Sequence, residues 1–392
     1  MTTKINQLKP PKKIKIGIDA SCILPRKTGV GKFSLSLLRE MLSLESPFEF
    51  ILFLNSFRHS KIDLPLAGMK NIKIKQYRLP GPLLVQSWRY LRFPPIDLLT
   101  GFVDAFHSLS GYIPPQIHGK KIVSVYDLFF MRHTEQCDVL GGQYFASVFP
   151  KQLPQCEHII CPSNSTKKDL IELLKIPTDN ISVIYGGVDQ RKFHIITDYP
   201  LLEMIRKEYC LPPRYILGVS TLEMRKNLDG LFIAYKHLKE KLYNPPKLVL
   251  VGGEGWKSTE IKSAVKQHRL ISDVIFTGYI PEEHLPLIYN SALFFVFPSL
   301  WEGFGLPVLE AMACGVPCLI SDIPALHEIA EEAALFADPY NYYEMAERMK
   351  DLITSHTLRE TLQQKGLAQV NKFSWRLTAQ KTLRVYEKIL KT

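Results

Sequence analysis

Short apolar runs recur along the chain, and an amphipathic segment follows most of them. Residues 14–18, 48–54, 215–219 and 247–251 are the clearest of these runs. Runs of this length, rich in β-branched and aromatic residues, are typical of buried strands, whereas apolar positions three or four residues apart are typical of helices. Strands that alternate with helices predict parallel sheets, so we expect an α/β fold.

The length of 392 residues indicates more than one hydrophobic core. Single cores rarely grow beyond about 250–300 residues, so we expect two domains. Residues 190–212 are polar and end at a pair of prolines, which is typical of a connection between domains.

Residues 293–329 combine a buried apolar run, a glycine-containing loop, a short helix and a second apolar run, which predicts a β-loop-α-β unit. The helix should cover residues 307–314, because proline suits the first helical position and glycine suits the position after the end. The loop then brings Phe304, Gly305 and Leu306 to the N-terminus of this helix. Unpaired backbone N–H groups and the positive end of the helix dipole favour an anion such as phosphate there.

Two carboxylates lie close to this helix N-terminus. Glu302 is in the loop and Glu310 is in the helix, with seven residues between them. A carboxylate beside a bound phosphate would repel it, so Glu310 is better suited to accept hydrogen bonds from the diol of a ribose. Glu302 is suited to the hydroxyls of a sugar in the same way. Phosphate, ribose and sugar together indicate a nucleotide-sugar, although two glutamates at this spacing also occur on solvated helix faces.

Arg225 and Lys226 follow the predicted strand at residues 215–219 and precede a helix that starts near residue 228. Adjacent cations at a strand end can neutralise a pyrophosphate, arginine by bidentate pairing and lysine as a point charge. A solvated turn is the ordinary interpretation of an isolated pair of this kind.

Gly29 and Gly31 lie in a predicted loop between the strand at residues 14–18 and a helix at residues 32–42. Strand, glycine loop and helix form the opening of a Rossmann-like domain, and glycine lets a phosphate approach the backbone closely. The third glycine of the dinucleotide-binding fingerprint is missing, so a tight turn is the competing interpretation.

The run from Glu302 to Glu310, with the sequence EGFGLPVLE, resembles the E-x7-E motif of the retaining family-4 glycosyltransferases of GT-B fold. The similarity continues through residues 311–317 and extends over most of the chain. It implies two Rossmann-like domains that face each other across a cleft.

The resemblance also implies the domain boundaries. Residues 13–190 would form the N-terminal acceptor domain, and residues 213–373 would form the donor domain that binds the nucleotide-sugar. A terminal helix over residues 374–392 would cross back and pack on the first domain.

Several site residues follow from the same resemblance. Arg225 and Lys226 would hold the donor diphosphate, which reverses the preference for a solvated turn. The loop with Gly29 and Gly31 would face the donor phosphates. The loop that contains Ile280 resembles the one that holds the nucleotide base through backbone groups, so its side chains would not reveal the base.

Near the reacting sugar the chain departs from the family, because Tyr126 stands where many relatives have a histidine. Either Tyr126 fills that role through its hydroxyl, or His107 or Asp127 does. We predict strands at residues 103–106 and 122–126, which would place these side chains at strand ends, where ligand sites in open α/β sheets lie.

The resemblance implies transfer of a hexose from a nucleoside diphosphate sugar with retention of configuration. Electrostatic stabilisation of the departing diphosphate would dominate, and the diphosphate itself would take the acceptor proton, so no enzymic nucleophile is expected. GDP-mannose is the preferred donor and a glycan or lipid-linked molecule the acceptor, by similarity to bacterial mannosyltransferases of surface polysaccharide synthesis. A UDP-sugar-dependent transferase, an epimerase or phosphorylase, and a non-catalytic sugar-binding scaffold are the alternatives.

Basic residues exceed acidic ones by 49 to 38, which gives a net charge of +11. No RNA- or DNA-binding motif accompanies this charge, so we expect no nucleic acid and consider an anionic membrane surface the better candidate partner. Residues 77–99 mix arginines with aromatic side chains, which fits either an interfacial membrane helix or a core helix with a basic edge.

No apolar run approaches 18 residues, and the N-terminal residues lack the apolar core of a signal peptide. We therefore expect a cytoplasmic protein, peripheral on the inner face of the membrane. The seven cysteines and eleven histidines show no spacing typical of a zinc site. No Asp-x-Asp motif lies beside the candidate site, so we predict no metal and no bound cofactor.

Overall fold

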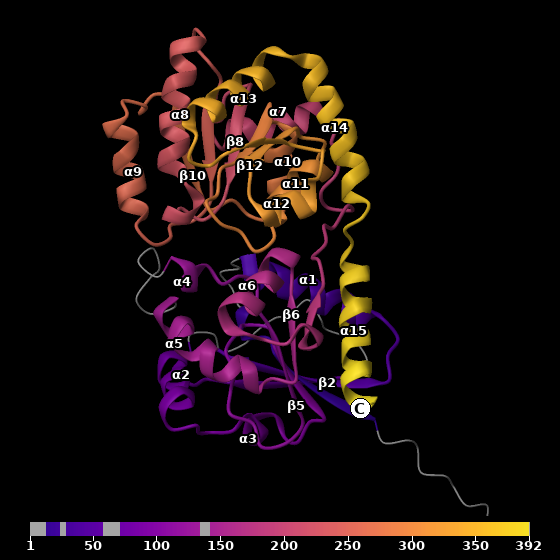
Figure 1. Cartoon of the computed structure of the whole chain (residues 1–392). Coiled ribbons are helices and arrows are strands. Elements are labelled where there is room, and N and C mark those ends of the chain that lie inside the picture. The colour runs from indigo at the N-terminus through magenta and orange to yellow at the C-terminus, as the bar shows by residue number, and fades with distance from the viewer. Residues whose placement is uncertain (1–12, 24–28, 58–70, 134–141, 392) are drawn as a thin grey trace, which may run out of the picture. The chain divides into compact units, whose positions relative to one another are not determined.

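The computed structural model describes residues 13–23, 29–57, 71–133 and 142–391. Contacts divide the chain into two compact units. One unit contains Met1–Ser124, Gln152–Ile160 and Ala379–Thr392, and the other contains Val125–Lys151 and Cys161–Thr378. Two parallel sheets organise the chain (Figure 1).

The first sheet has seven strands in the order β3-β2-β1-β4-β5-β6-β7. The strand pairs from β3 to β6 are parallel. Chain order changes direction between β1 and β4, as in the doubly wound Rossmann-like sheet. The strands are β1 (Ile14–Asp19), β2 (Phe48–Asn55), β3 (Ile72–Tyr77), β4 (Ala105–Ser108), β5 (Lys120–Ser124), β6 (His158–Cys161) and β7 (Ile181–Val183).

Helices connect several of these strands, as is usual for crossovers between parallel strands. They are α1 (Gly29–Ser43), α2 (Gly81–Tyr90), α3 (Ile96–Thr100), α4 (Phe129–Arg132), α5 (Gly142–Gln152) and α6 (Asn164–Leu174). The last helix of the chain, α15 (Trp375–Lys391), places Tyr386 against Phe48 of β2, with their ring centroids 5.9 Å apart.

The second sheet has six strands in the order β10-β9-β8-β11-β12-β13, and its pairs are parallel. Here chain order changes direction between β8 and β11. The strands are β8 (Tyr215–Val219), β9 (Lys247–Val251), β10 (Val274–Gly278), β11 (Phe294–Phe297), β12 (Cys318–Ser321) and β13 (Leu335–Ala337). Its helices are α7 (Tyr199–Glu208), α8 (Leu228–Lys241), α9 (Ser258–Gln267), α10 (Leu285–Asn290), α11 (Leu306–Ala313), α12 (Pro324–Ala330), α13 (Tyr342–Thr354) and α14 (His356–Val370).

Both faces of the second sheet are buried, which explains its continuous apolar runs. In β8, Tyr215 and Leu217 belong to one core cluster and Ile216 to another, because successive side chains point to opposite faces. The first cluster includes residues of α7, α10, α11 and α12, and the second includes residues of α8, α9 and α13. Figure 1 shows α8 and α11 on opposite sides of this sheet. The fold class, with two Rossmann-like parallel sheets in an α/β chain, is confirmed.

The segment 190–212 differs from the expected polar connection, because it contains α7. Asp198 accepts a hydrogen bond from the Leu201 backbone N–H at 3.0 Å and so caps this helix. Leu202 and Ile205 are buried in the core of the second sheet. Two buried apolar positions in one short helix give too weak a periodic pattern to be recognised among the polar residues around them.

Two element boundaries and one additional strand also differ from the sequence-based expectation. The helix α1 begins at Gly29, so Gly29 and Gly31 lie in its first turn and not in a preceding loop. The strand β4 runs two residues further than predicted, which places His107 inside it. The strand β13 was not predicted, because three residues give too short a pattern for an alternation to be recognised. Among the described residues, no helix is both long and apolar enough to cross a bilayer.

Candidate functional site

Two loops of the second sheet meet where the order of its strands changes direction. Arg225 and Lys226 lie in a short 3-10 helix after β8, and Glu302 lies in the loop after β11. Because β8 and β11 are parallel neighbours, both loops leave the same edge of the sheet. The backbone N–H of Leu300 donates to the carbonyl of Arg225 at 2.9 Å and joins the loops directly.

Three predicted site residues form one ion-paired cluster at this edge. The Lys226 ammonium lies 2.5 Å from Oε1 of Glu302, and an Arg225 guanidinium nitrogen lies 3.4 Å from Oε2. The Nε atom of Arg225 also pairs with Glu223 at 3.1 Å. Lys226 and Glu302 are buried, with 8% and 9% of their surface exposed. A cation pair and a carboxylate therefore share a desolvated site, where electrostatic interactions are stronger than in water.

The charges of this cluster control one another's ionisation. Burial alone would raise the pKa of Glu302, but Lys226 and Arg225 outweigh burial and hold that pKa below its ordinary value. Burial also lowers the pKa of Arg225, yet the carboxylates of Glu302 and Asp127 outweigh it and raise that pKa. Burial and the neighbouring Arg225 cation lower the pKa of Lys226. Glu302 and Arg225 are therefore charged at neutral pH.

The loop that leads into α11 depends on Gly305. Its φ angle is +123°, a conformation that residues with a side chain rarely adopt. A Cβ atom there would also lie 2.8 Å from Leu326 and 2.9 Å from Ile329 of α12. The helix starts at Leu306, one residue before the expected position, and the Phe304 side chain is buried in the core of the second sheet. The backbone thus brings the N-terminus of α11 to the same sheet edge as the cluster.

Glu310 has a partner that sequence reasoning missed. The hydroxyl of Tyr289, in α10, donates to Oε2 of Glu310 at 3.0 Å, and both side chains are buried. Burial and the Glu310 carboxylate raise the pKa of Tyr289 well above its ordinary value, so the phenol stays protonated as a donor. A single tyrosine on an apolar helix face gives no sequence signal of this contact. Its geometry indicates that Tyr289 orients Glu310.

Replacing Tyr289 by phenylalanine should weaken donor binding about five- to tenfold, which is about 1–1.4 kcal/mol. This is less than the roughly 1.5–3 kcal/mol that a hydrogen bond to a charged group contributes, because Tyr289 acts on the donor only by orienting Glu310. Isothermal titration with nucleotide-sugar would measure the affinity. Tyr215→Phe is the matched control, since the Tyr215 hydroxyl donates to the Ile288 carbonyl at 2.6 Å in the same core. Both variants should lose stability in urea unfolding. Equal donor affinities in the two variants would show that Tyr289 does not act through Glu310.

The predicted base-binding loop follows β10. Ile280 has only 2% of its surface exposed and packs in the core of the second sheet, whereas Tyr279 is 66% exposed. Gly278 adopts a φ angle of +72° at the turn. The Ile280 side chain therefore anchors the loop, and contact with a base through its backbone stays a prediction.

His107 lies in the interior of the first sheet. Its Nδ1 atom is 2.6 Å from the hydroxyl of Tyr386 in α15, and its Nε2 atom is 2.9 Å from Oγ of Ser124. It has no exposed surface, and burial followed by the charge of His158 lowers its pKa to about 3. Both ring nitrogens are thus engaged within the protein. This environment favours a neutral histidine that fixes α15 to β4 over contact with a sugar.

Tyr126 and Asp127 follow β5, just beyond its last residue, and both are half-buried. The Tyr126 carbonyl accepts a hydrogen bond from the Thr166 hydroxyl at 3.1 Å. One oxygen of Asp127 accepts from the Phe129 backbone N–H at 3.1 Å, in the turn that precedes α4. Of the three alternatives near the sugar, these two have the more accessible side chains, and the choice between them stays open.

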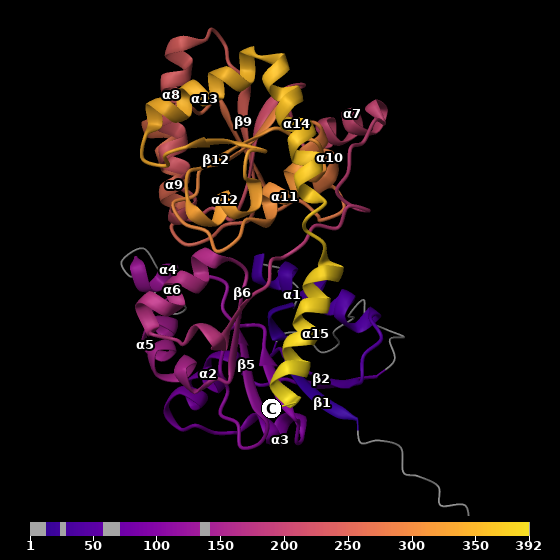
Figure 2. The same cartoon turned by 45° about the vertical axis from the view of Figure 1, so that its right-hand side comes forward.

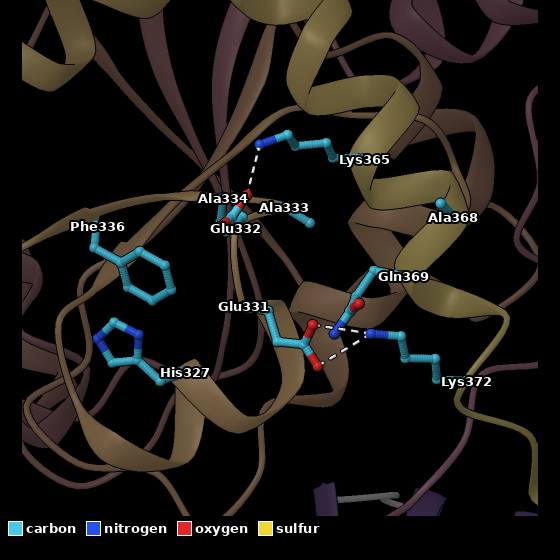
Figure 3. Close-up of a pocket in the computed structure, with 10 residues that line it drawn as sticks. All are labelled: His327, Glu331, Glu332, Ala333, Ala334, Phe336, Lys365, Ala368, Gln369 and Lys372. Carbon is cyan, nitrogen blue, oxygen red and sulfur yellow. Dashed lines mark hydrogen bonds and ion pairs between the residues drawn. The ribbon is translucent and has the colours of Figure 1, made fainter.

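A hollow of about 890 Å³ lies elsewhere on the second sheet's unit, between α12, β13 and α14 (Figure 3). Glu331 pairs with Lys372 at 2.9 Å, and Glu332 pairs with Lys365 at 3.0 Å. The hollow contains none of the predicted site residues, and its two ion pairs are exposed, whereas the pair of Lys226 and Glu302 is buried. We therefore place the candidate site at the β8 and β11 loops.

No group of three or more His, Cys, Asp and Glu side chains is placed to hold a metal ion in the described part of the chain. The cluster after β8 and β11 instead offers cations, which attract anions and not metals. That the reaction needs no metal stays a prediction.

Two family models match the chain, Glycosyltransferase Family 4 over residues 30–192 and Glycosyl transferases group 1 over residues 205–369. O-antigen chain mannosyltransferase B of Escherichia coli is 28% identical over 377 residues, which are 92% of this chain and 96% of that protein. Serotype-specific mannosyltransferase WbdA of Escherichia coli is 32% identical over 281 residues, 70% of this chain but only 34% of WbdA.

Solved structures show the same fold. Sucrose-phosphate synthase from Thermosynechococcus elongatus has a TM-score of 0.75 at 19% identity and covers 96% of this chain and 99% of its own. Anabaena HepE, in complex with UDP and glucose, has a TM-score of 0.71 at 15% identity and covers 96% of this chain and 100% of its own. The two family models together match most of the chain. It therefore belongs to the GT-B glycosyltransferases that combine a family 4 domain with a group 1 domain.

Proposed function

We propose that this glycosyltransferase moves mannose from GDP-mannose to a glycan or lipid-linked acceptor in surface polysaccharide synthesis, with retention of configuration and without a metal ion. The observation that carries the proposal is the meeting of the β8 and β11 loops, which brings Arg225, Lys226 and Glu302 together. The two cations that would bind a diphosphate thus lie within hydrogen-bonding distance of the carboxylate that would bind sugar hydroxyls.

Each group would have a distinct task in the reaction. Arg225 and Lys226 would stabilise the diphosphate as it leaves the sugar and gains negative charge, with the N-terminus of α11 as a further donor. Glu310, oriented by Tyr289 at 3.0 Å, would accept hydrogen bonds from the ribose diol. Glu302 would accept from hydroxyls of the sugar.

Retention without an enzymic nucleophile requires that the acceptor attacks from the face that the diphosphate leaves. The departing diphosphate would take the acceptor proton, so the protein needs to position the two substrates and neutralise charge. The two cations at the β8 loop supply charge that a metal ion would otherwise supply.

The choice of mannose is supported by the relatives, since those that match long stretches of the chain include an O-antigen chain mannosyltransferase and a serotype-specific mannosyltransferase. The choice of GDP rests on this similarity alone. A UDP-sugar remains the alternative donor, and a non-catalytic sugar-binding scaffold the alternative function.

We further propose that the reaction takes place at an anionic membrane surface on the cytoplasmic side. The net charge of +11 would favour such a surface, because each basic residue near anionic lipid contributes roughly 1 kcal/mol. A lipid-linked acceptor would also be concentrated there.

A thermal-shift screen against nucleoside diphosphates and their sugars, with and without EDTA, tests the donor and the metal. GDP and GDP-mannose should raise the Tm of the wild type equally with and without EDTA, and the shift should shrink in Glu310→Ala. Larger shifts with UDP compounds would replace the proposed donor. A complete lack of shifts would favour the scaffold.

A further inference from the structure

A group of large apolar side chains on α2, α3 and the residues beside them faces solvent. Six of these side chains are 58–74% exposed: Leu83, Tyr90, Leu91, Phe93, Leu98 and Phe102. Single exposed apolar residues are ordinary, but several on neighbouring elements mark an interaction surface. We call these six residues the α2–α3 surface.

The inward sides of the same elements explain why these six point outward. Leu84 and Trp88 of α2 and Ile96 of α3 share one core cluster with Ile51 and Phe53 of β2. Both helices therefore cover the same side of the first sheet, and Figures 1 and 2 show them in the same region of it. Positions seven residues apart lie on one face of a helix, so Leu83 and Tyr90 lie together and away from this core.

The segment after α2 is held in place by side chains of α2. The Trp88 indole donates to the Pro94 carbonyl at 3.0 Å, and the Ser87 hydroxyl donates to the Phe93 carbonyl. Leu91 and Phe93 are thus presented on a fixed backbone. A fixed apolar surface loses little conformational entropy when a partner covers it.

Arginines lie in the segment that carries the α2–α3 surface. Residues 78–102 contain three basic residues, Arg78, Arg89 and Arg92, and one acidic residue, Asp97. Asp97 is only 6% exposed and accepts hydrogen bonds from the backbone N–H groups of residues 117 and 118. The Arg89 guanidinium lies 5.0 Å from the centre of the Tyr90 ring. The one carboxylate is therefore turned away from the surface that the arginines flank.

We propose that the α2–α3 surface docks on an anionic lipid bilayer, with its aromatic and leucine side chains in the interface and its arginines at the phosphates. Aromatic and long basic side chains suit the boundary between headgroups and acyl chains, and anionic lipid complements the excess of cations. The inference builds on the membrane association proposed above and names the surface responsible. It does not depend on the identity of the donor.

Co-sedimentation with vesicles of phosphatidylcholine, with and without phosphatidylglycerol, tests the assignment. Wild type should bind the anionic vesicles, and Arg89→Gln/Arg92→Gln should bind them roughly 20-fold more weakly. Tyr90→Ser/Leu91→Ser/Phe93→Ser should lose about tenfold or more, because less apolar area enters the interface. The control replaces three exposed apolar residues of the other unit by serine, Tyr199, Met204 and Tyr243, and should bind like wild type.

The outcomes separate this inference from the proposed function. If both α2–α3 variants bind anionic vesicles as tightly as wild type, the α2–α3 surface is not the docking surface, and membrane association must be due to another face. Failure of the wild type to bind any anionic vesicle would overturn both the surface and the membrane association. The Tm shift with nucleotide should stay unchanged in both variants, which shows that they are folded and that donor binding is a separate property. A donor screen without any shift, combined with vesicle binding as expected, would overturn the proposed transfer reaction alone.

Discussion

Lys226→Met is expected to lower kcat/KM for glycosyl transfer by about 100- to 1000-fold, the usual effect of removing one group that stabilises charge developing in a transition state. Methionine keeps the length of the side chain but removes the cation that lies 2.5 Å from Glu302 at the β8 loop. Steady-state assays with donor and acceptor would measure the loss. It should appear mainly in kcat, because the negative charge on the diphosphate grows as the sugar departs.

Lys239→Met is the matched control for this variant. Lys239 pairs with Asp273 at 2.7 Å in the same unit, but neither residue belongs to the candidate site. Its replacement should leave turnover unchanged. Turnover of Lys226→Met within about threefold of the control would show that this cation does not stabilise the leaving group.

Lys226→Met should also change how the stability of the fold depends on pH. The pKa of Glu302 in the folded wild type is lowered below 4.5, so its ion pairs stabilise the fold above about pH 4.5 and are lost as pH falls through the lowered pKa. Loss of Lys226 raises that pKa towards the value that burial favours. The Tm difference between wild type and variant should therefore be large at pH 7 and shrink below about pH 4.5.

Much of the second sheet could be predicted from local sequence. The runs at residues 215–219 and 247–251 match β8 and β9 residue for residue, because a strand buried on both faces forms a nearly continuous apolar run. Arg225, Lys226 and Glu302 were each expected near a ligand. Their direct pairing was not, since contact between residues so far apart in sequence follows from β8 and β11 being neighbours in the sheet.

The first sheet shows where local patterns fail. His107 was predicted at a strand end, yet β4 continues past it and α15 covers it with Tyr386. No local pattern links residues separated by 279 positions. Gly29 likewise gave the signal of a loop, although glycine is also tolerated in the first turn of a helix, where α1 places it.

Tyr289 was missed for a related reason. An apolar helix such as α10 predicts only that a tyrosine is buried, and the need of a buried phenol for an acceptor is the single hint of Glu310. The residues proposed to contact a ligand could thus be named from motifs, whereas the contact between Tyr289 and Glu310 required the fold.

Glu302→Gln is expected to separate nucleotide binding from transfer. In the structure Glu302 neutralises the two cations that the diphosphate would need, and its own charge would repel the diphosphate. A unit charge about 6 Å away contributes roughly 3 kcal/mol at an effective dielectric constant of about 20, of which counter-ions and rearrangement remove part. We therefore expect the free nucleoside diphosphate to bind about tenfold more tightly to the variant. Transfer should fall about 10- to 100-fold, because a neutral amide is a weaker acceptor for the sugar hydroxyls.

Stability provides a second measurement on Glu302→Gln. Without the carboxylate, the buried Lys226 and the partly exposed Arg225 lie side by side as like charges, and breaking a buried pair costs up to roughly 3–5 kcal/mol. The variant should melt at a lower temperature than wild type, and the nucleoside diphosphate should raise its Tm by more, because the ligand supplies the missing negative charge. Glu223→Gln is the control, since Glu223 also pairs with Arg225 but is more exposed than Glu302. Weaker nucleotide binding by Glu302→Gln than by this control would show that Glu302 supports the diphosphate site and does not compete for it.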